Sequence, residues 1–315
     1  MGKLAFVFPG QGAQSVGMGK DVFDAVPEAR LVFETADRAL GFPLSELIFH
    51  GPEEELKRTF NAQPALLTTS VALLSALRVR TDVRPDYVAG HSLGEYTALV
   101  AAGALSFEDA VRLVRIRGEC MEEAVPAGRG GMAAVLGADR EALVRLCERI
   151  SAEIGPIEPA NVNAPGQIVV SGVAAAVKAV VERAAEAGAR RAVLLEVSGP
   201  FHSSLMKPAA ERFGAYVAQT TFRPPVVPVV SNVTAESATE PETIRNLLVR
   251  QVTAPVLWED SVRWLVGQGV DRFVEIGPGQ VLSGLIRRIA PAVRVISVDG
   301  LPALSKVSDQ LVESG

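Results

Sequence analysis

A serine flanked by glycines is the residue best suited to do chemistry in this chain. The segment 90–94 reads GHSLG, with Ser92 at its centre and a glycine two residues away on each side. An apolar run precedes the segment and a helix-like run follows it, which predicts a sharp strand-to-helix turn. Such a turn brings backbone segments too close for a Cβ atom, and glycine avoids that contact. The pattern predicts that Ser92 is a nucleophile, although a short motif of this kind also arises by chance.

A serine nucleophile needs a base, and the chain contains three histidines, His50, His91 and His202. His91 adjoins Ser92 and is expected to point away from it at a sharp turn, while His50 lies in a polar connection. His202 lies in the segment 199–203 (GPFHS), where the chain leaves a predicted small subdomain and reaches the expected cleft. We therefore predict that His202 is the base. The alternative is a turn histidine with a structural hydrogen bond.

A glycine-rich turn follows the first apolar run. Residues 8–14 read FPGQGAQ, and a turn of this kind presents backbone N–H groups to a phosphate or to an oxyanion. A dinucleotide-binding fingerprint fits poorly, because Ser15 occupies the third glycine position and Pro9 intrudes on the turn. An oxyanion-binding turn suits a serine nucleophile better. The similar stretch 275–279 (EIGPG) is expected only to join a strand to a helix.

Arg117 stands on the apolar face of a predicted helix. In a helical projection of residues 108–125, apolar side chains gather around it and the other charged side chains lie opposite. A buried guanidinium keeps its proton and needs a carboxylate or phosphate partner in bidentate geometry. That partner is either an internal carboxylate, with Glu95 as a candidate, or a carboxylate carried by the substrate. The nearby serine makes the substrate carboxylate at least as well supported.

Composition excludes several classes of protein. A chain of 315 residues that is 48% hydrophobic forms one large domain or two smaller ones, and it does not fit disorder. A net charge of −5 with scattered basic residues gives no nucleic-acid surface. Cys120 and Cys147 lack metal-ligand spacing and are expected to be packed thiols. The opening apolar run is too short for a signal peptide, and no run reaches membrane-spanning length, so we expect a cytoplasmic chain without a membrane partner.

Short apolar strands alternate with longer amphipathic stretches, a pattern typical of an α/β protein with a mainly parallel sheet. The strands expected in that sheet are 4–8, 87–89, 226–230, 272–276 and 293–298. A different order, strand-helix-strand-strand-helix-strand, is expected at 132–136, 140–150, 157–162, 167–171, 174–187 and 191–197. This order predicts an inserted ferredoxin-like subdomain at 128–198, inside a large α/β catalytic unit formed by 1–127 and 199–315. The active site should lie in the cleft between the two units.

Together these residues resemble one family closely, the malonyl-CoA:acyl carrier protein transacylases of fatty acid synthesis. The resemblance covers essentially the whole chain. Its motifs are the segments 8–12 (FPGQG), 90–95 (GHSLGE), 111–118 (VRLVRIRG), 161–167 (NVNAPGQ), 201–202 (FH) and 248–251 (LVRQ). The resemblance implies a hydrolase-like α/β unit with an inserted ferredoxin-like subdomain, in agreement with the order of elements above.

The resemblance also implies roles in catalysis. Ser92 would be the acylated nucleophile and His202 its base. The main-chain carbonyl of Gln251 would orient the imidazole where hydrolases use an aspartate, which would account for the absence of an obvious acidic partner.

Further roles concern the substrate. The backbone N–H groups of Gln11 and Leu93 would form the oxyanion hole, and Arg117 would bind the malonyl carboxylate. The loop at Asn161 is expected to border the cleft, either as a substrate contact or only as a turn. Phe201, directly before the histidine, agrees with use of malonyl rather than methylmalonyl groups.

The activity implied is ping-pong transfer of malonyl from malonyl-CoA to the phosphopantetheine thiol of an acyl carrier protein, by a monomer that needs no metal or redox cofactor. Two other classes stay open. A serine thioester hydrolase would pass the acyl group to water, and a binding module would use Arg117 only as an anion clamp. An acyltransferase serving a polyketide synthase, or the transferase of a malonate decarboxylase, would share these motifs.

An acyl carrier protein is expected to be acidic, so basic residues near the cleft are candidates for its contact surface. Clustering in the sequence singles out Arg190, Arg191, Arg287 and Arg288. The alternative for each is solvated surface charge.

Overall fold

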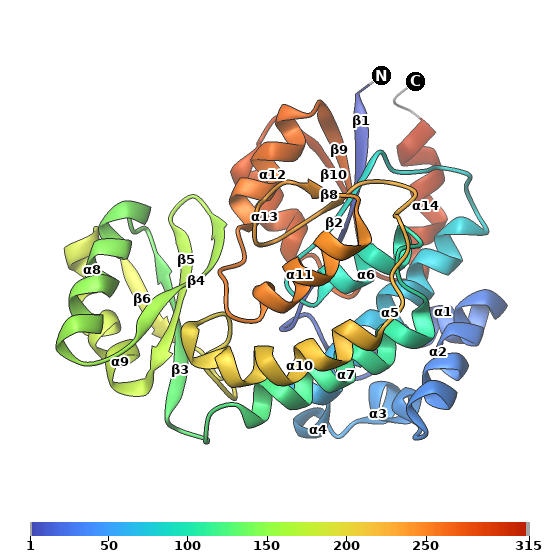
Figure 1. Cartoon of the computed structure of the whole chain (residues 1–315). Helices are drawn as coiled ribbons and strands as arrows, with labels where there is room; N and C mark the ends of the chain where they lie inside the picture. The colour runs from blue at the N-terminus through green and yellow to red at the C-terminus, as the bar shows by residue number, and fades with distance from the viewer. Residues whose placement is uncertain (1, 313–315) are drawn as a thin grey trace.

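In the computed structural model, which describes residues 2–312 and side chains up to residue 307, the chain is built around two separate sheets (Figure 1). The larger sheet has the strand order β10-β9-β1-β2-β7-β8, and its neighbours are parallel except for β7 and β8. Its strands are β1 (Lys3–Phe8), β2 (Tyr87–Gly90), β7 (Val229–Val230), β8 (Ser237–Ala238), β9 (Val270–Ile276) and β10 (Arg294–Val298). The expected mainly parallel sheet is confirmed.

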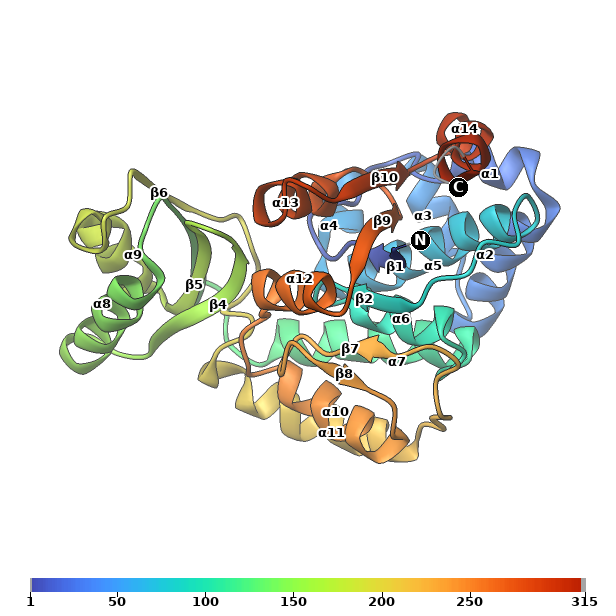
Figure 2. The same ribbon diagram turned by 90° about the horizontal axis from the view of Figure 1, so that it is seen from above.

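Helices pack on both faces of this sheet, as the view from above shows (Figure 2). One face is covered by α12 (Trp258–Gly267) and α13 (Val281–Ile289), and the other by α5 (Thr59–Arg78), α6 (Gly94–Ala101) and α7 (Phe107–Glu123). The other helices of this unit are α1 (Lys20–Ala25), α2 (Pro27–Leu40), α3 (Leu44–His50), α4 (Glu53–Lys57), η2 (Ser204–Met206), α10 (Lys207–Gln219), α11 (Pro241–Gln251) and α14 (Leu301–Val312).

The smaller sheet belongs to a unit that stands to one side of the large one (Figure 1). Its elements are β3 (Gly130–Leu136), α8 (Arg140–Glu153), β4 (Ile157–Ala164), β5 (Gln167–Val173), α9 (Ala174–Arg183), η1 (Ala184–Ala187) and β6 (Arg191–Leu194). The sheet is antiparallel with the order β4-β5-β3-β6, and it packs against its own apolar cluster. The predicted β-α-β-β-α-β order is therefore confirmed, while the unit boundaries at 128 and 198 stay a prediction.

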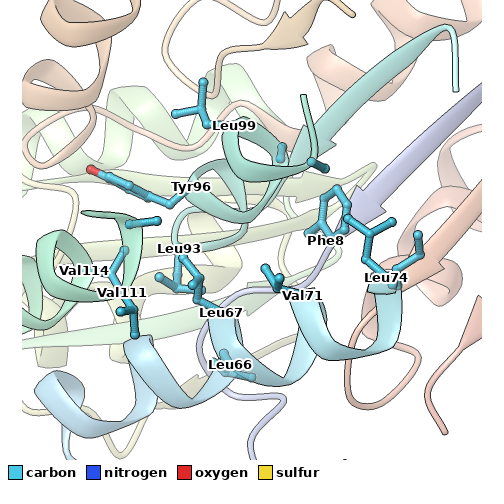
Figure 3. Close-up of a cluster of buried hydrophobic side chains, with 14 of the residues drawn as sticks. Phe8, Leu66, Leu67, Val71, Leu74, Leu93, Tyr96, Leu99, Val111 and Val114 are labelled. Atoms are coloured by element: carbon cyan, nitrogen blue, oxygen red, sulfur yellow. The ribbon is translucent and has the colours of Figure 1, made fainter. Parts of the chain in front are cut away.

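Helix α5 lies at the centre of the large unit. Its apolar side chains pack against residues of β1, of α7 and of the segment around α6 (Figure 3). By length and composition alone this helix could cross a membrane, but 89% of its 18-residue apolar stretch is buried inside the protein. The expectation that no run reaches membrane-spanning length was therefore wrong, because an apolar core helix of 20 residues satisfies the same criterion.

The contact between α5 and α7 is adapted to a proline. Pro64 lies inside α5 and has no N–H, so the carbonyl of Phe60 four residues earlier loses its helical partner. The guanidinium of Arg115 on α7 donates to that carbonyl at 3.3 Å. Gly118, one turn further along α7, faces the same place, where a Cβ atom would come within 2.5 Å of the Phe60 Cα. The two helices can therefore pack closely, and α7 places the side chain of Arg117 in the interior.

The strand expected at 226–230 is shorter than predicted. Only Val229 and Val230 belong to β7, whereas Val226 is 82% exposed and its N–H donates to the carbonyl of Ala102. Pro228 lacks an N–H and limits pairing at the start of the strand. The short strand β8 was not predicted. Cys120 and Cys147 are buried free thiols, as expected.

Candidate active site

Ser92 lies on a strained turn between β2 and α6. Its φ is 51°, in the left-handed region that residues with side chains rarely adopt. A Cβ atom on Gly90 would come within 1.9 Å of the Gly94 carbonyl carbon, and one on Gly94 within 2.1 Å of the Phe8 carbonyl oxygen. Both glycines are therefore required by close contact, which confirms the steric reason predicted for them.

His202 approaches Ser92 from the segment that leaves the small unit, and its own φ is 56°. Its Nε2 lies 2.8 Å from the Oγ of Ser92, and its Nδ1 lies 2.8 Å from the main-chain carbonyl oxygen of Gln251. Because that carbonyl accepts only, Nδ1 carries the proton and Nε2 is left to accept one from the serine. Burial, followed by the charge of Arg117, lowers the pKa of His202 to about 3. The imidazole is thus neutral at neutral pH, as a general base must be.

The guanidinium of Arg117 reaches the same hydroxyl from α7. The residue is 1% exposed, which confirms the burial predicted from the helical projection. Its Nη2 lies 3.1 Å from the Oγ of Ser92 and 3.0 Å from the Oε1 of Gln251, while Nη1 donates to the Oε1 of Gln63 at 2.7 Å. The ring of Tyr96 lies 5.3 Å from the guanidinium carbon, close enough for a cation–π contact.

The internal ion pair considered for Arg117 does not form. Among the described residues, no carboxylate oxygen lies within 4.0 Å of this guanidinium, the distance that defines an ion pair. The Nε of Arg117 has no hydrogen-bond partner there either. Glu95, the candidate partner, instead accepts from the Nε2 of Gln251 at 2.8 Å and from the backbone N–H of Asn232 at 3.0 Å. Neutral amides therefore surround a buried cation, which leaves it able to bind a carboxylate brought by a substrate.

Two backbone amides lie beside the serine. Gln11 follows β1, Leu93 directly follows Ser92, and β1 and β2 are neighbouring parallel strands. A Cβ atom on Gly10 would lie 2.3 Å from the carbonyl oxygen of His91, so the glycine-rich turn packs against the serine turn. Neither amide donates to a protein acceptor in the part of the chain that the structure describes. Both are free to donate to an oxyanion.

Similarity to known proteins establishes the family of the chain. A model of the acyl transferase domain matches residues 5–300. The chain belongs to the acyl transferase family. A relative named malonyl CoA-acyl carrier protein transacylase from Bacillus subtilis is 52% identical over 298 residues, which are 95% of this chain and 94% of the relative. One of the same name from Staphylococcus aureus is 49% identical over 301 residues, or 96% and 97% of the two chains.

Solved structures of family members share the fold. An acyl-carrier-protein S-malonyltransferase from Bartonella henselae superposes with a TM-score of 0.95 at 44% identity, over 99% of this chain and 100% of that one. A malonyl-transacylase in complex with a holo type II polyketide acyl-carrier protein superposes equally well, with a TM-score of 0.95 at 42% identity over 98% and 99% of the two chains. The predicted fold class, a large α/β unit with a ferredoxin-like one, is thus confirmed.

Three polar side chains of this acyl transferase site were missed by the sequence analysis. Asn232 accepts from the N–H of Ser92 at 2.7 Å and donates to the carbonyl of Gly90 at 2.7 Å, so it fixes the serine turn. Gln63 and the side chain of Gln251 hold Arg117. The available signals were weak ones: Gln63 is a polar residue inside an apolar helix, and Asn232 lies two residues after the end of a strand of the parallel sheet.

The two histidines set aside from the sequence lie away from the hydroxyl. His91 bonds through Nε2 to the Oδ1 of Asn163 at 2.8 Å, and His50 pairs with Glu46 on the surface at 3.0 Å. Asn161 is buried on β4, where the main-chain groups of its neighbours bridge to Val256. It is therefore Asn163, and not Asn161, whose side chain contacts the serine turn.

Burial raises the pKa of Glu95 from 4.5 to about 7, against the lowering effects of its two hydrogen bonds and Arg117. A carboxyl whose folded-state pKa is raised binds more protons folded than unfolded between those values, so stability falls as pH rises through this window. Relative to the parent, Glu95→Gln should therefore gain stability between pH 5 and 7.5, on the order of 2 kcal/mol. Urea unfolding at several pH values measures this difference. His202 titrates with the opposite sign but in both proteins, so a pH-independent difference would contradict the raised pKa.

Proposed function

We propose that this chain transfers malonyl groups from malonyl-CoA to the phosphopantetheine thiol of an acyl carrier protein, through a malonyl ester on Ser92. One observation carries the proposal: Arg117 and His202 both contact the Oγ of Ser92, at 3.1 and 2.8 Å. A serine with a base on one side and an unpaired buried cation on the other fits an acyl group that carries its own carboxylate. The curated relatives bear the name of this activity.

In the first half-reaction, the Nε2 of His202 takes the serine proton as Oγ attacks the thioester carbonyl carbon. The carbonyl oxygen becomes an oxyanion, which the N–H groups of Gln11 and Leu93 stabilise. When the tetrahedral intermediate collapses, the C–S bond breaks and the sulfur of coenzyme A leaves with the proton held by His202. The malonyl carboxylate stays on the guanidinium of Arg117.

The second half-reaction reverses these steps with a different thiol. The phosphopantetheine thiol of the carrier gives its proton to His202 and attacks the malonyl ester, and the Oγ of Ser92 leaves with that proton. The carbonyl of Gln251 keeps the imidazole in one tautomer through both halves. These proton and acyl transfers need no metal or redox cofactor, and they use residues of one chain, which is consistent with a cytoplasmic monomer.

Intact-mass measurement after brief incubation with malonyl-CoA tests the proposal. We expect a malonyl adduct, mapped by peptide digestion to the segment containing Ser92, that disappears when holo carrier protein is added. Discharge by water at the same rate without a carrier would favour the thioester hydrolase. No covalent adduct at all would favour the anion-binding module.

The carrier could belong to fatty acid or polyketide synthesis. The names of the curated relatives specify an acyl carrier protein without its pathway, whereas one structural relative is bound to a type II polyketide carrier. Loading rates measured with the two kinds of holo carrier distinguish them.

The carrier surface is proposed at the basic residues singled out above. Arg190, Arg191 and Arg288 line one hollow beside Gly137 and Gly166, between the small unit and α13. Arg288 also donates to the side chain of Gln167 and the carbonyl of Pro165. Arg287 instead bonds to the carbonyl of Val295. An acidic carrier would be attracted to the three arginines of the hollow.

Reversing charge in this hollow should weaken carrier binding. In a double variant with Arg190→Glu and Arg191→Glu, we expect the KM for the holo carrier to rise about tenfold, because rim charges act mainly on association. The rate of Ser92 malonylation by malonyl-CoA should stay close to that of the parent. Arg145→Glu, on the exposed face of α8, is the matched control. An unchanged KM for the carrier would remove Arg190 and Arg191 from the docking surface.

A further inference from the structure

The helix that follows the nucleophile carries a second buried charged residue. Glu95 is the second residue of α6, and it is 3% exposed. Its Oε2 accepts from the N–H of Asn232 and from the side-chain amide of Gln251. Among the residues that the structure describes, no basic group forms an ion pair with it. A buried carboxylate without a direct ion pair is costly, so its position calls for a functional reason.

The amide of Gln251 connects this carboxylate to Arg117. Its Nε2 donates to Glu95 at 2.8 Å, and its Oε1 accepts from the Nη2 of Arg117 at 3.0 Å. The amide dipole is therefore oriented with its positive end toward a carboxylate and its negative end toward a guanidinium. This orientation stabilises a negative charge on Glu95 and a positive charge on Arg117 at the same time.

The empty acyl site and the malonyl-occupied acyl site differ in their balance of buried charges. Burial lowers the pKa of Arg117, but a guanidinium stays protonated at neutral pH, so the site always holds one cation. With the site empty, the negative charge on Glu95 compensates that cation across one amide. A bound malonyl group adds a second carboxylate on the guanidinium, and one cation then faces two anions in a buried space.

We propose that Glu95 is the counter-charge of Arg117 while the acyl site is empty or holds acetyl, and that Glu95 takes up a proton from solvent when a malonyl carboxylate occupies Arg117. Glu95 is thus a positioning residue that acts through Gln251 and couples malonyl loading to protonation. The inference rests on the proposed malonyl-serine intermediate.

The neighbouring titratable groups keep their protonation states across the relevant pH range. Arg117 from α7 and Tyr96 on α6 interact electrostatically with Glu95, and the other titratable groups of the site are His202, before η2, and His91, before α6. Burial lowers the pKa of His91, lowers that of His202 to about 3, and raises that of Tyr96. Asn232 and Gln251, which bond the carboxylate, are themselves neutral. Between pH 6 and 9 the titrating group is therefore Glu95, whose pKa burial raises to about 7.

The pH dependence of acyl selection tests this inference. Malonyl binding is favoured by protonation of Glu95, whereas acetyl binding is not, so the ratio of apparent affinities for malonyl-CoA and acetyl-CoA should fall between pH 6 and 9 as Glu95 loses its proton. A second negative charge across a guanidinium is expected to raise a buried carboxyl pKa by about one unit, which corresponds to a fall of roughly tenfold. Titration of His202 or of the thiol leaving group affects both substrates and cancels in the ratio.

Variants identify the titrating group. Glu95→Gln keeps the shape of the side chain and an acceptor for both hydrogen bonds, and it should make the ratio independent of pH. Glu275→Gln is the matched control: Glu275 is also buried with a raised pKa, but it bonds the backbone N–H groups of Leu282 and Ser283 at the start of α13. The control should keep the dependence of the parent, and the same dependence in Glu95→Gln would overturn the inference.

Proton uptake by the parent enzyme gives a second readout that needs no variant. In weak buffer at pH 7.5 with an indicator dye, malonylation should take up about half a proton per adduct more than acetylation, for a shift of one unit. Equal uptake with both substrates, while the malonyl adduct forms normally, would refute the role of Glu95 and leave the proposed function intact. Absence of the adduct would instead refute the proposed function.

Discussion

Ser92→Ala is expected to form no malonyl adduct and to lose malonyl transfer by at least about 10⁴-fold. The Oγ of Ser92 is the atom that contacts both the base and the guanidinium, and an alanine offers no bond to carry the acyl group. Intact mass reports the adduct, and transfer to radiolabelled or mass-resolved carrier reports turnover. A folded variant that still transfers malonyl at a comparable rate would contradict the covalent mechanism.

Two further variants make this result specific. Ser171→Ala, a buried serine on β5 in the small unit, should form the adduct like the parent. His202→Ala should lose nearly as much activity as Ser92→Ala, and the double variant should be no worse than either, because the two residues act as a unit. Additive losses would indicate that His202 does not activate Ser92.

Arg117→Ala is expected to reverse the preference for malonyl. Removing the guanidinium leaves the malonyl carboxylate buried without its partner, a loss of about 3 to 4 kcal/mol, or about 10² to 10³-fold in kcat/KM for malonyl-CoA. Acetyl-CoA has no carboxylate there, and its kcat/KM should fall far less or rise. The measurement is the ratio of the two kcat/KM values for adduct formation.

Arg112→Ala serves as the control for charge and helix content. Arg112 lies on the same helix, but its exposed side chain bonds the carbonyl of Ala39 and pairs with Asp109, and it does not reach Ser92. Its substitution should leave the ratio of malonyl to acetyl unchanged. Arg117→Lys should recover only part of the preference, because an ammonium cannot make the bidentate pair. A ratio unchanged in Arg117→Ala would remove Arg117 from carboxylate binding.

Much of the fold could be predicted because its signals are local. Strand β1 is a continuous apolar run after Lys3, as expected for a strand covered by helices on both faces. The order of elements in the small unit was equally readable. The failures occurred where local signals conflict with the environment: prolines shorten β7, and the apolar composition of α5 reflects a central position in the core that sequence periodicity cannot show.

The same distinction between local and tertiary signals applies to the site. The flanking glycines identify Ser92 in the sequence, and a position on an apolar helix face identifies Arg117. The structure places the two side chains within hydrogen-bond distance of each other. Glu95 could not be separated from an ion-pair partner of Arg117, because sequence does not tell whether a third side chain stands between two charges. Gln251 does stand there, and its amide joins chain segments more than 130 residues apart. Such polar networks are set by tertiary contact alone.

The carbonyl that holds His202 belongs to the last residue of α11. Carbonyls at the carboxyl end of a helix lack partners within the helix, and together they carry about half a negative charge. The helix therefore takes the place of an acidic side chain in this site. Since the acceptor is part of the main chain, no side-chain substitution at position 251 deletes it. The orientation of the imidazole is accordingly robust to point mutation, and the side chain of Gln251 is left free to serve the charges around the acyl group.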